Sequence, residues 1–266
     1  MLVLNNVAKR YGDSETGTLA VQDLTFEIGR NEVVTIVGPS GCGKTTVLKL
    51  MAGLISPSSG TIDVDGTPVT RPPQEIALVF QDYVNSLYPW MTVQQNVEFP
   101  LERAVRDRAH RRERVMSAIE SVGLRGFESQ YPWQLSGGMQ QRVAIARGLA
   151  YQPQMLLMDE PFGALDAQTR AELEDLVLQV RAQFGITIVF VTHDIDESVY
   201  LADRVLVMGP RPTFIEADLA VGLPSPRDQI ETKELPEFAR VRSDVYRRIR
   251  RSSDIMRSRA GAAVTS

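Results

Sequence analysis

The chain has 266 residues, a formal net charge of −4 and 43% hydrophobic residues, a balance typical of a globular protein that gives no global case for nucleic-acid binding. It contains no run of 18 apolar residues and no secretory leader pattern at its start, so we expect no membrane span and no signal peptide. The single cysteine, Cys42, excludes a disulfide within the chain and fits a reducing, cytoplasmic compartment.

The N-terminal part of the chain is rich in strand patterns. Apolar alternation or short apolar runs predict strands over 2–8, 19–28, 32–37, 61–64 and 76–80. A polar segment over 12–18 separates the first two strands, and a glycine-rich turn after the third leads into a helix predicted over 44–54. Asp65-Gly66 is a hairpin turn signal at the end of the fourth strand.

The pattern changes at Gln81. Residues 93–150 are mostly helical and predict a helical insertion over about 91–150. Beyond the insertion, a helix is predicted over 167–184 and strands over 155–158, 187–192, 204–208 and 213–217. Strands that alternate with helices favour an α/β fold with a mainly parallel sheet covered on both faces.

The C-terminal part follows a proline-rich link. We expect one domain over 1–230 and a short helical tail over 231–266, with the helix at 235–259. Phe238, Val241, Val245 and Ile249 recur at helical spacing, so one face of this helix is expected to pack on the body. The opposite face carries arginines, which are interpreted as a solvated face, with anionic lipid headgroups as the alternative contact.

A glycine-rich loop joins the strand over 32–37 to the next helix. It fits the phosphate-loop pattern G-x-x-x-x-G-K-[ST] and comprises Gly38, Pro39, Ser40, Gly41, Cys42, Gly43, Lys44 and Thr45, with Thr46 next. Glycines let the backbone N–H groups turn toward phosphate oxygens, and the helix start adds its dipole. Lys44 is expected to reach the β- and γ-phosphates, and the Thr45 hydroxyl to bind Mg²⁺. A chance glycine turn is the alternative, which the strand–turn–helix context disfavours.

Two acidic residues end the apolar strand over 155–158. Asp159 is placed to make a second Mg²⁺ contact, and Glu160 to polarise the water that attacks the γ-phosphate. Many strands end in solvated acids, so this pattern carries weight only together with the phosphate loop.

A second anion-binding helix start is predicted at residue 136. Ser136 and the glycines Gly137 and Gly138 precede a helix that is predicted over 140–150 and begins at Gln140. The full string Leu135-Ser136-Gly137-Gly138-Met139-Gln140-Gln141-Arg142 resembles the signature motif of ABC ATPases, with Met139 where many members have glutamine.

Further residues match motifs of that family in register, over residues 2–230. They are Tyr11 as the residue that stacks on adenine, Gln81 of the Q-loop, Asp166 of the D-loop and His193 of the switch region. The resemblance implies a P-loop ABC ATPase cassette, with a mainly parallel sheet core, an antiparallel N-terminal β subdomain and a helical insertion.

The resemblance also implies a mechanism. Two copies of the chain enclose ATP between the phosphate loop of one and the signature residues of the other. Thr45, Asp159 and Gln81 are expected to surround Mg²⁺, Glu160 to activate water, and His193 to sense the γ-phosphate.

Two classes of ABC protein remain open. One is the ATPase subunit of a transporter, and the alternative is a soluble ABC ATPase that acts on ribosomes or DNA. A single set of motifs on a chain without spans resembles bacterial importers, and the stretch Tyr88-Pro89-Trp90-Met91-Thr92-Val93 resembles the nitrate/sulfonate/taurine branch. This implies a separate permease, an extracytoplasmic binding protein, a place on the cytoplasmic face of the plasma membrane and no nucleic-acid partner. The transported solute is not encoded in this chain.

Cys42 lies inside the phosphate loop at a helix start, which favours the thiolate. We therefore expect either a reactive thiol whose modification blocks ATP binding, or a small residue that simply fits the loop.

Overall fold

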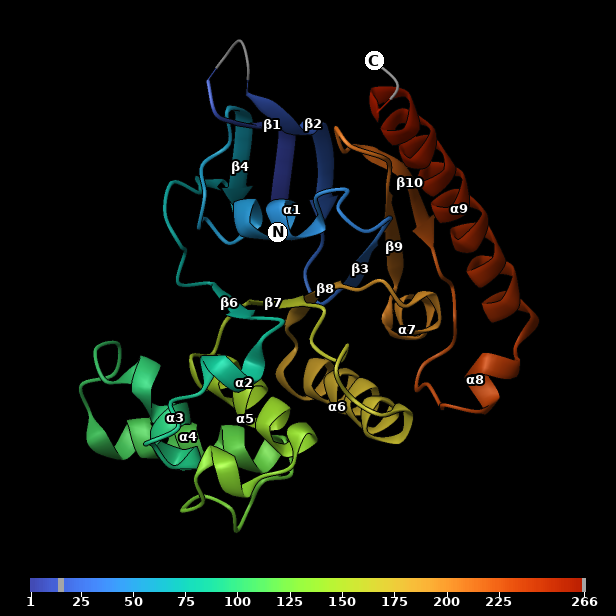
Figure 1. The fold of residues 1–266 in the computed structure, drawn as a ribbon. Coiled ribbons are helices and arrows are strands. Elements are labelled where there is room, and N and C mark those ends of the chain that lie inside the picture. Colours follow the sequence, from blue (N-terminus) through green and yellow to red (C-terminus); the bar gives the residue numbers. More distant parts are fainter. Residues whose placement is uncertain (14–16, 265–266) are drawn as a thin grey trace. The chain divides into compact units, whose positions relative to one another are not determined.

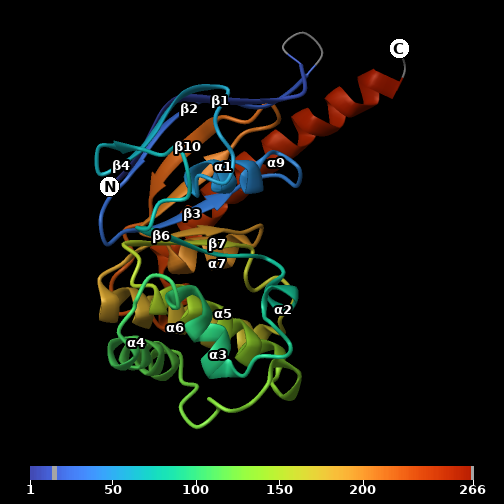
Figure 2. The same cartoon turned by 90° about the vertical axis from the view of Figure 1, so that its left-hand side faces the viewer.

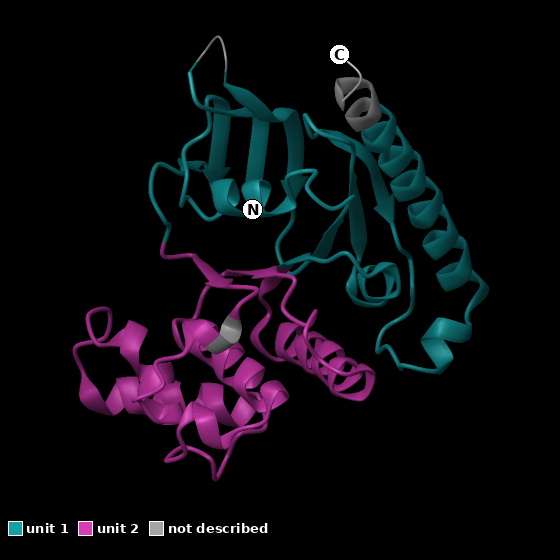
Figure 3. Cartoon of the chain, in the orientation of Figure 1, with its two compact units in different colours: residues 1–73, 189–266 teal, residues 74–188 magenta. Residues whose placement is uncertain are grey.

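The computed structural model describes residues 1–13 and 17–264, so the polar segment predicted over 12–18 lies partly outside the described residues. The chain forms two compact units (Figure 3). Unit 1 comprises Met1–Pro73 and Val189–Ser266, and unit 2 comprises Gln74–Ile188.

Unit 1 begins with an antiparallel sheet of strand order β2-β1-β4-β5 (Figure 1). Its strands are β1 (Leu2–Tyr11), β2 (Thr18–Ile28), β4 (Ser59–Val64) and β5 (Thr67–Pro68). One face is buried, with Leu2 and Leu4 of β1 and Leu24 and Ile28 of β2 at 0% exposure. The antiparallel N-terminal β subdomain is therefore confirmed.

The Asp65-Gly66 turn joins β4 to β5 as predicted. Both residues have positive φ, at 49° and 78°, which is the backbone that a two-residue hairpin turn requires.

The rest of unit 1 is built on a second set of strands. Here β3 (Val33–Val37) pairs in parallel with β9 (Arg204–Met208), and β10 (Ile215–Ala220) pairs antiparallel with β9. All five residues of β3 are buried, which explains its continuous apolar run. The helices of unit 1 are α1 (Lys44–Met51), α7 (Ile195–Leu201), α8 (Glu231–Glu234) and α9 (Pro236–Val264).

The tail helix packs as its periodicity predicts. Helix α9 lies against α7 and β9 (Figure 1). Phe238, Val241 and Val245 are buried at 2%, 3% and 0% exposure, and Ile249 is only partly buried, so most of the predicted apolar face is covered.

Several predicted boundaries in unit 1 differ from the structure, and one helix and one strand show why. The helix predicted over 44–54 ends at Met51, because Gly53 has φ +65° and leaves the helical conformation. The strand predicted over 213–217 is β10, which begins at Ile215. Thr213 instead bonds across to β2, where its N–H donates to Ala20 O at 3.0 Å and its carbonyl accepts from Gln22 N at 2.8 Å.

Unit 2 is mainly helical, as predicted for residues 93–150. Strands β6 (Ile76–Val79) and β7 (Met155–Asp159) pair in parallel, and β8 (Thr187–Val191) crosses the boundary between the units in sequence. The helices are α2 (Tyr83–Ser86), α3 (Val93–Glu98), α4 (Arg108–Ser121), α5 (Gly137–Ala150) and α6 (Ala167–Phe184), with 3-10 turns at Phe99–Leu101 and Pro132–Gln134. Helix α5 contacts α2, α3, α4, α6 and β6 (Figure 2), which places the signature helix at the centre of this unit.

Candidate functional site

The phosphate loop runs from the end of β3 to the start of α1. Gly41 and Gly43 have φ of +75° and +123°, so both positions require glycine. A Cβ at Gly38 would lie 3.0 Å from the Cβ and the carbonyl oxygen of Met208. The start of the loop is therefore closely packed against β9. The positive φ angles of Gly41 and Gly43 turn the backbone sharply before the helix begins.

The Lys44 side chain lies inside this loop. It is 6% exposed, and its Nζ donates to Gly38 O at 3.1 Å and to Pro39 O at 3.4 Å. Thr45, next along the helix, is exposed. The loop thus combines a fixed ammonium, a helix start and an accessible hydroxyl, which suits phosphate oxygens.

Tyr11 lies beside the same loop. Its hydroxyl is 3.5 Å from Thr46 Oγ1, and Lys9 Nζ lies 5.4 Å from its ring centroid. The ring is 43% exposed. Unit 1 therefore brings the predicted adenine-stacking residue next to the predicted phosphate site.

Cys42 does not fit the expectation of a reactive thiolate. Its side chain is fully buried, and burial raises the pKa of its thiol, with a smaller opposing effect from Lys44. The helix start and Lys44 were expected to lower the pKa of the thiol. Burial has the larger effect, because it removes the thiolate from water and so destabilises it more than the nearby positive charge stabilises it.

In unit 2, the predicted magnesium and water-activating residues lie around the end of β7. Asp159 is the last residue of the strand and is 6% exposed. Gln81 Nε2 donates to Glu160 Oε2 at 3.4 Å, so two predicted catalytic residues that are far apart in sequence are in contact. Glu160 has φ +42°, a conformation that costs energy in a residue with a Cβ and that often marks functional sites.

The signature residues form the start of α5. Ser136 is the N-cap, and its Oγ accepts from Met139 N at 3.3 Å, while Gly137 is the first helical residue. Gln140 Nε2 donates to Pro132 O at 2.9 Å and to Leu135 O at 3.2 Å. These bonds fix the turn that precedes the motif.

Gly138 packs on the start of α6. A Cβ there would lie 2.5 Å from Thr169 Cγ2, so any larger residue at this position would displace the Thr169 side chain. Asp166 is the N-cap of α6, accepting from Thr169 N at 3.0 Å and from Thr169 Oγ1 at 2.7 Å. These hydrogen bonds lower the pKa of Asp166. Sequence analysis did not identify Thr169, which carried no signal beyond its place three residues after an N-cap.

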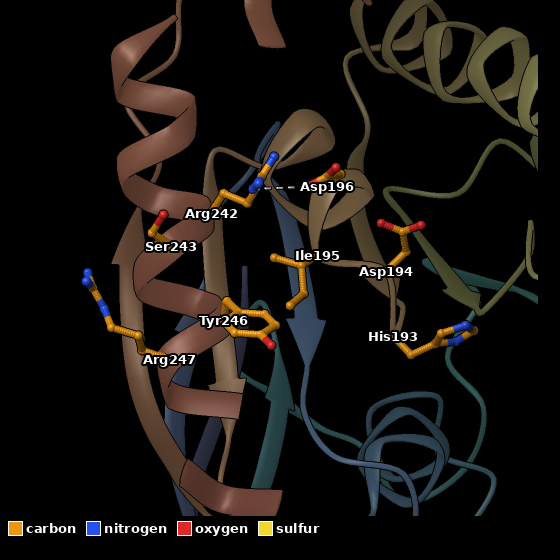
Figure 4. A pocket seen from close by; sticks show the side chains of 8 residues that line it. All are labelled: His193, Asp194, Ile195, Asp196, Arg242, Ser243, Tyr246 and Arg247. Carbon is orange, nitrogen blue, oxygen red and sulfur yellow. Dashed lines mark ion pairs between the residues drawn. The ribbon is translucent and has the colours of Figure 1, made fainter. Parts of the chain in front are cut away.

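His193 follows β8 and precedes α7 in unit 1. Asp194, the N-cap of α7, accepts from Glu197 N at 3.1 Å. A pocket of about 710 Å³ is lined by His193 to Asp196 and by residues of α9. Figure 4 shows Ile195 and Tyr246 facing each other there, and the Arg242 Nε lies 3.6 Å from Asp196 Oδ1. The tail helix thus contacts the helix that follows His193, a placement that sequence analysis missed although the amphipathic pattern of α9 indicated packing.

A family model and several relatives of known sequence are similar to this chain over most of its length. The family model described as ABC transporter matches residues 21–163. A Brucella abortus relative named as an ATP-binding protein is 48% identical over 91% of this chain and 90% of its own length. The nitrate import ATP-binding protein NrtC of Synechococcus elongatus is 44% identical over 85% of this chain and 35% of that longer protein. The aliphatic sulfonates import ATP-binding protein SsuB of Bacillus thuringiensis is 41% identical over 90% of this chain and 96% of its own length.

Solved structures agree with the sequence relatives. A dimeric ATP-binding cassette in a post-hydrolysis state with ADP and phosphate matches with a TM-score of 0.72 and 33% identity, over 83% of this chain and 98% of that one. The structure of cbiO1 from Clostridium perfringens, part of the ABC transporter complex cbiONQ, matches with a TM-score of 0.74 and 31% identity, over 82% of this chain and 87% of that one.

Proposed function

The chain belongs to the ABC transporter family, and from this premise we propose that it powers uptake of a small nitrate-, sulfonate- or taurine-like solute through a separate permease. It is an ATP-binding subunit of a bacterial importer, and it hydrolyses ATP in the course of transport. The relatives named for nitrate and sulfonate import support the solute class.

The observation that carries this function is the glycine loop closed around the Lys44 ammonium. In the proposed mechanism Lys44 and the backbone N–H groups hold the β- and γ-phosphates. Tyr11 stacks on adenine, and its position beside Thr46 supports this role. The carboxylate of Glu160 accepts the proton of the attacking water, and His193 contacts the γ-phosphate.

Mg²⁺ fits the proposed donor set. The Thr45 hydroxyl, the Asp159 carboxylate and the Gln81 carboxamide all present oxygen, which Mg²⁺ prefers. Gln81 uses its Nε2 toward Glu160, so its Oε1 is the end of the amide that would face a metal. The ion would supply positive charge to the phosphate oxygens as negative charge develops on the leaving group.

The proposed assembly is a two-fold dimer of this chain on two permease subunits. Each ATP lies between the phosphate loop of one copy and Ser136, Gly137, Gly138 and Gln140 of the other, with Asp166 near the interface. An extracytoplasmic binding protein delivers the solute, and no nucleic acid takes part. We place the chain on the cytoplasmic face of the plasma membrane, held there by the permease.

A membrane span is not found in the described part of the chain: none of its helices is both long and apolar enough to cross a bilayer.

The substitution Glu160→Gln tests the catalytic assignment. We expect ATP to bind with unchanged affinity and turnover to fall by about 10²-fold or more, because the amide cannot accept the proton of the attacking water. Radiolabelled ATP binding and phosphate release measure the two effects. Wild-type turnover in Glu160→Gln contradicts the assignment.

The same variant tests the importer role. Tagged Glu160→Gln protein is purified from gently solubilised membranes, and the co-purifying proteins are identified by mass spectrometry. A multi-span membrane protein at stoichiometric yield supports the importer. Ribosomal or DNA-repair proteins in its place would favour the soluble ABC ATPase alternative. The complex is then reconstituted with the wild-type chain, and nitrate, sulfonates or taurine are added with the cognate binding protein, so that stimulated ATP hydrolysis identifies the solute.

A further inference from the structure

Gln141 presents an unusual buried side chain on the signature helix. It is 0% exposed, and within the described part of the chain neither its Oε1 nor its Nε2 has a hydrogen-bond partner. An unpaired carboxamide in the interior destabilises a fold, and buried polar groups are normally paired. The side chain therefore needs an explanation other than packing.

A second buried carboxamide in the same unit shows the usual solution. Asn96 is also 0% exposed. Its Nδ2 donates to the carbonyls of Tyr88 at 3.1 Å, Met91 at 3.0 Å and Thr92 at 3.1 Å, and its Oδ1 accepts from Tyr88 N at 2.8 Å. A buried structural carboxamide in unit 2 is thus fully hydrogen-bonded, whereas the Gln141 carboxamide has no partner.

The surroundings of Gln141 follow from the glycines on its helix. A Cβ at Gly138 would meet Thr169 of α6, and a Cβ at Gly148 would lie 3.1 Å from Leu156 Cδ1 of β7 and 3.8 Å from the side chains of Ala77 and Val79 of β6. At about 100° per residue, Gln141 lies about 60° from Gly138 and about 20° from Gly148 around the helix. It therefore lies on the face of α5 between the start of α6 and the paired strands β6 and β7.

The segment 160–166 joins these two elements. It leaves the end of β7 at Glu160 and enters α6 at its N-cap, Asp166. Gln141 is consequently on the face of the signature helix that is turned toward the two elements which this segment joins. The segment holds the proposed base at one end and the proposed D-loop aspartate at the other.

We propose that Gln141 is a positioning residue that couples the signature helix to segment 160–166. Its carboxamide bonds to the backbone of that segment when ATP closes the dimer, and these bonds set the placement of Glu160 and Asp166. A group that is unpaired in one arrangement and paired in another favours the second arrangement. This inference rests on the proposed ATPase function and adds a residue to it.

Gln141→Leu tests the proposal, because leucine has a similar volume and no polar side-chain atoms. In the nucleotide-free protein we expect Tm to rise by about 2 °C or more, since an unpaired buried carboxamide is removed. We expect kcat for ATP hydrolysis to fall by about tenfold or more through misplacement of the catalytic segment. The KM for ATP stays within about twofold, because the phosphate loop is untouched. A residue that only packs would change Tm without this kcat effect.

Asn96→Leu is the matched control, an equally buried carboxamide that is fully paired. It should lower Tm, opposite in sign to Gln141→Leu. If Gln141→Leu does not fold, Gln141→Met, with an unbranched side chain of similar length, is measured by the same criteria.

Two results overturn the inference. One is unchanged kcat in the Leu or Met variant. The other is a fall in Tm for these variants, which would show that a bridging water already pairs the carboxamide in a structural role. The Glu160→Gln variant separates this failure from that of the proposed function. If Glu160→Gln loses turnover and Gln141→Leu keeps it, only the Gln141 inference fails, whereas turnover in Glu160→Gln removes the function on which it rests.

Discussion

Two residues of the site show that environment can override local sequence. Glu160 holds φ at +42°, a conformation that few residues with a Cβ adopt. Cys42 lies at a helix start beside Lys44, yet burial dominates and raises the pKa of its thiol. For Cys42, burial decides the state of the functional group.

The raised pKa of Cys42 predicts slow alkylation. A thiol with a raised pKa holds little thiolate at neutral pH, so its reactivity appears only as the pH rises above the ordinary thiol range. We expect iodoacetamide to modify the folded protein at pH 7.5 at least about tenfold more slowly than the same chain in urea. Mass spectrometry over time gives both rates, and Cys42→Ala gives the background. Fast modification that ATP prevents would instead restore the reactive-thiol hypothesis.

At the scale of the element, strand β9 is held by a charged cluster at its start. Arg204 Nε and the Asp218 Oδ1 of β10 lie 2.8 Å apart, and Arg204 NH1 lies 2.8 Å from Glu32 Oε1. Arg204 NH2 also donates to the backbone carbonyl of Glu27 at 3.1 Å. These partners raise the pKa of Arg204, so it remains charged and joins the end of β2 to β9 and β10.

We expect Arg204→Met to lower the free energy of unfolding by about 1–3 kcal/mol, because Glu32 and Asp218 lose a partly buried partner. Urea denaturation measures the change. Combining it with Glu32→Gln in a double-mutant cycle isolates the pair, and a loss below about 0.5 kcal/mol would show that solvent screening dominates.

At the scale of the whole molecule, the proposed ATP sites are composite. One chain carries the phosphate loop and the signature residues, and the similar cassette MJ0796 is dimeric in its solved structures. The assembly, rather than the single chain, then completes each site.

This predicts an ATP-dependent dimer. Glu160→Gln should elute as a dimer with Mg-ATP and as a monomer without it, because ATP forms part of the interface. Adding Ser136→Glu should abolish the dimer while single-chain ATP binding persists, since a carboxylate would face the γ-phosphate of the partner's ATP. Light scattering with fluorescent ATP binding measures both effects.

The matched control for this charge is Ser258→Glu, which changes an exposed serine on α9 and should leave the dimer intact. A dimer that survives Ser136→Glu would show that the signature does not contact the partner's nucleotide.

Much of the fold was predictable because its signals are local. Helix α6 coincides residue for residue with the prediction over 167–184, since Asp166 caps its start and Gly185, with φ +61°, ends it. Strand β9 also coincides with its prediction, whereas β10 was displaced because Thr213 bonds to β2, a pairing between distant segments.

The sequence by itself determined which chemistry to expect of this protein. The phosphate loop, the signature and the strand followed by the Asp159-Glu160 pair are contiguous motifs, so their residue types and spacing can be read along the chain. Only the tertiary structure decided how these groups are held. The burial of Cys42, the contact of Gln81 with Glu160 and the unpaired Gln141 depend on segments that meet only in the folded chain. Desolvation and packing act through such contacts, and no local pattern encodes them.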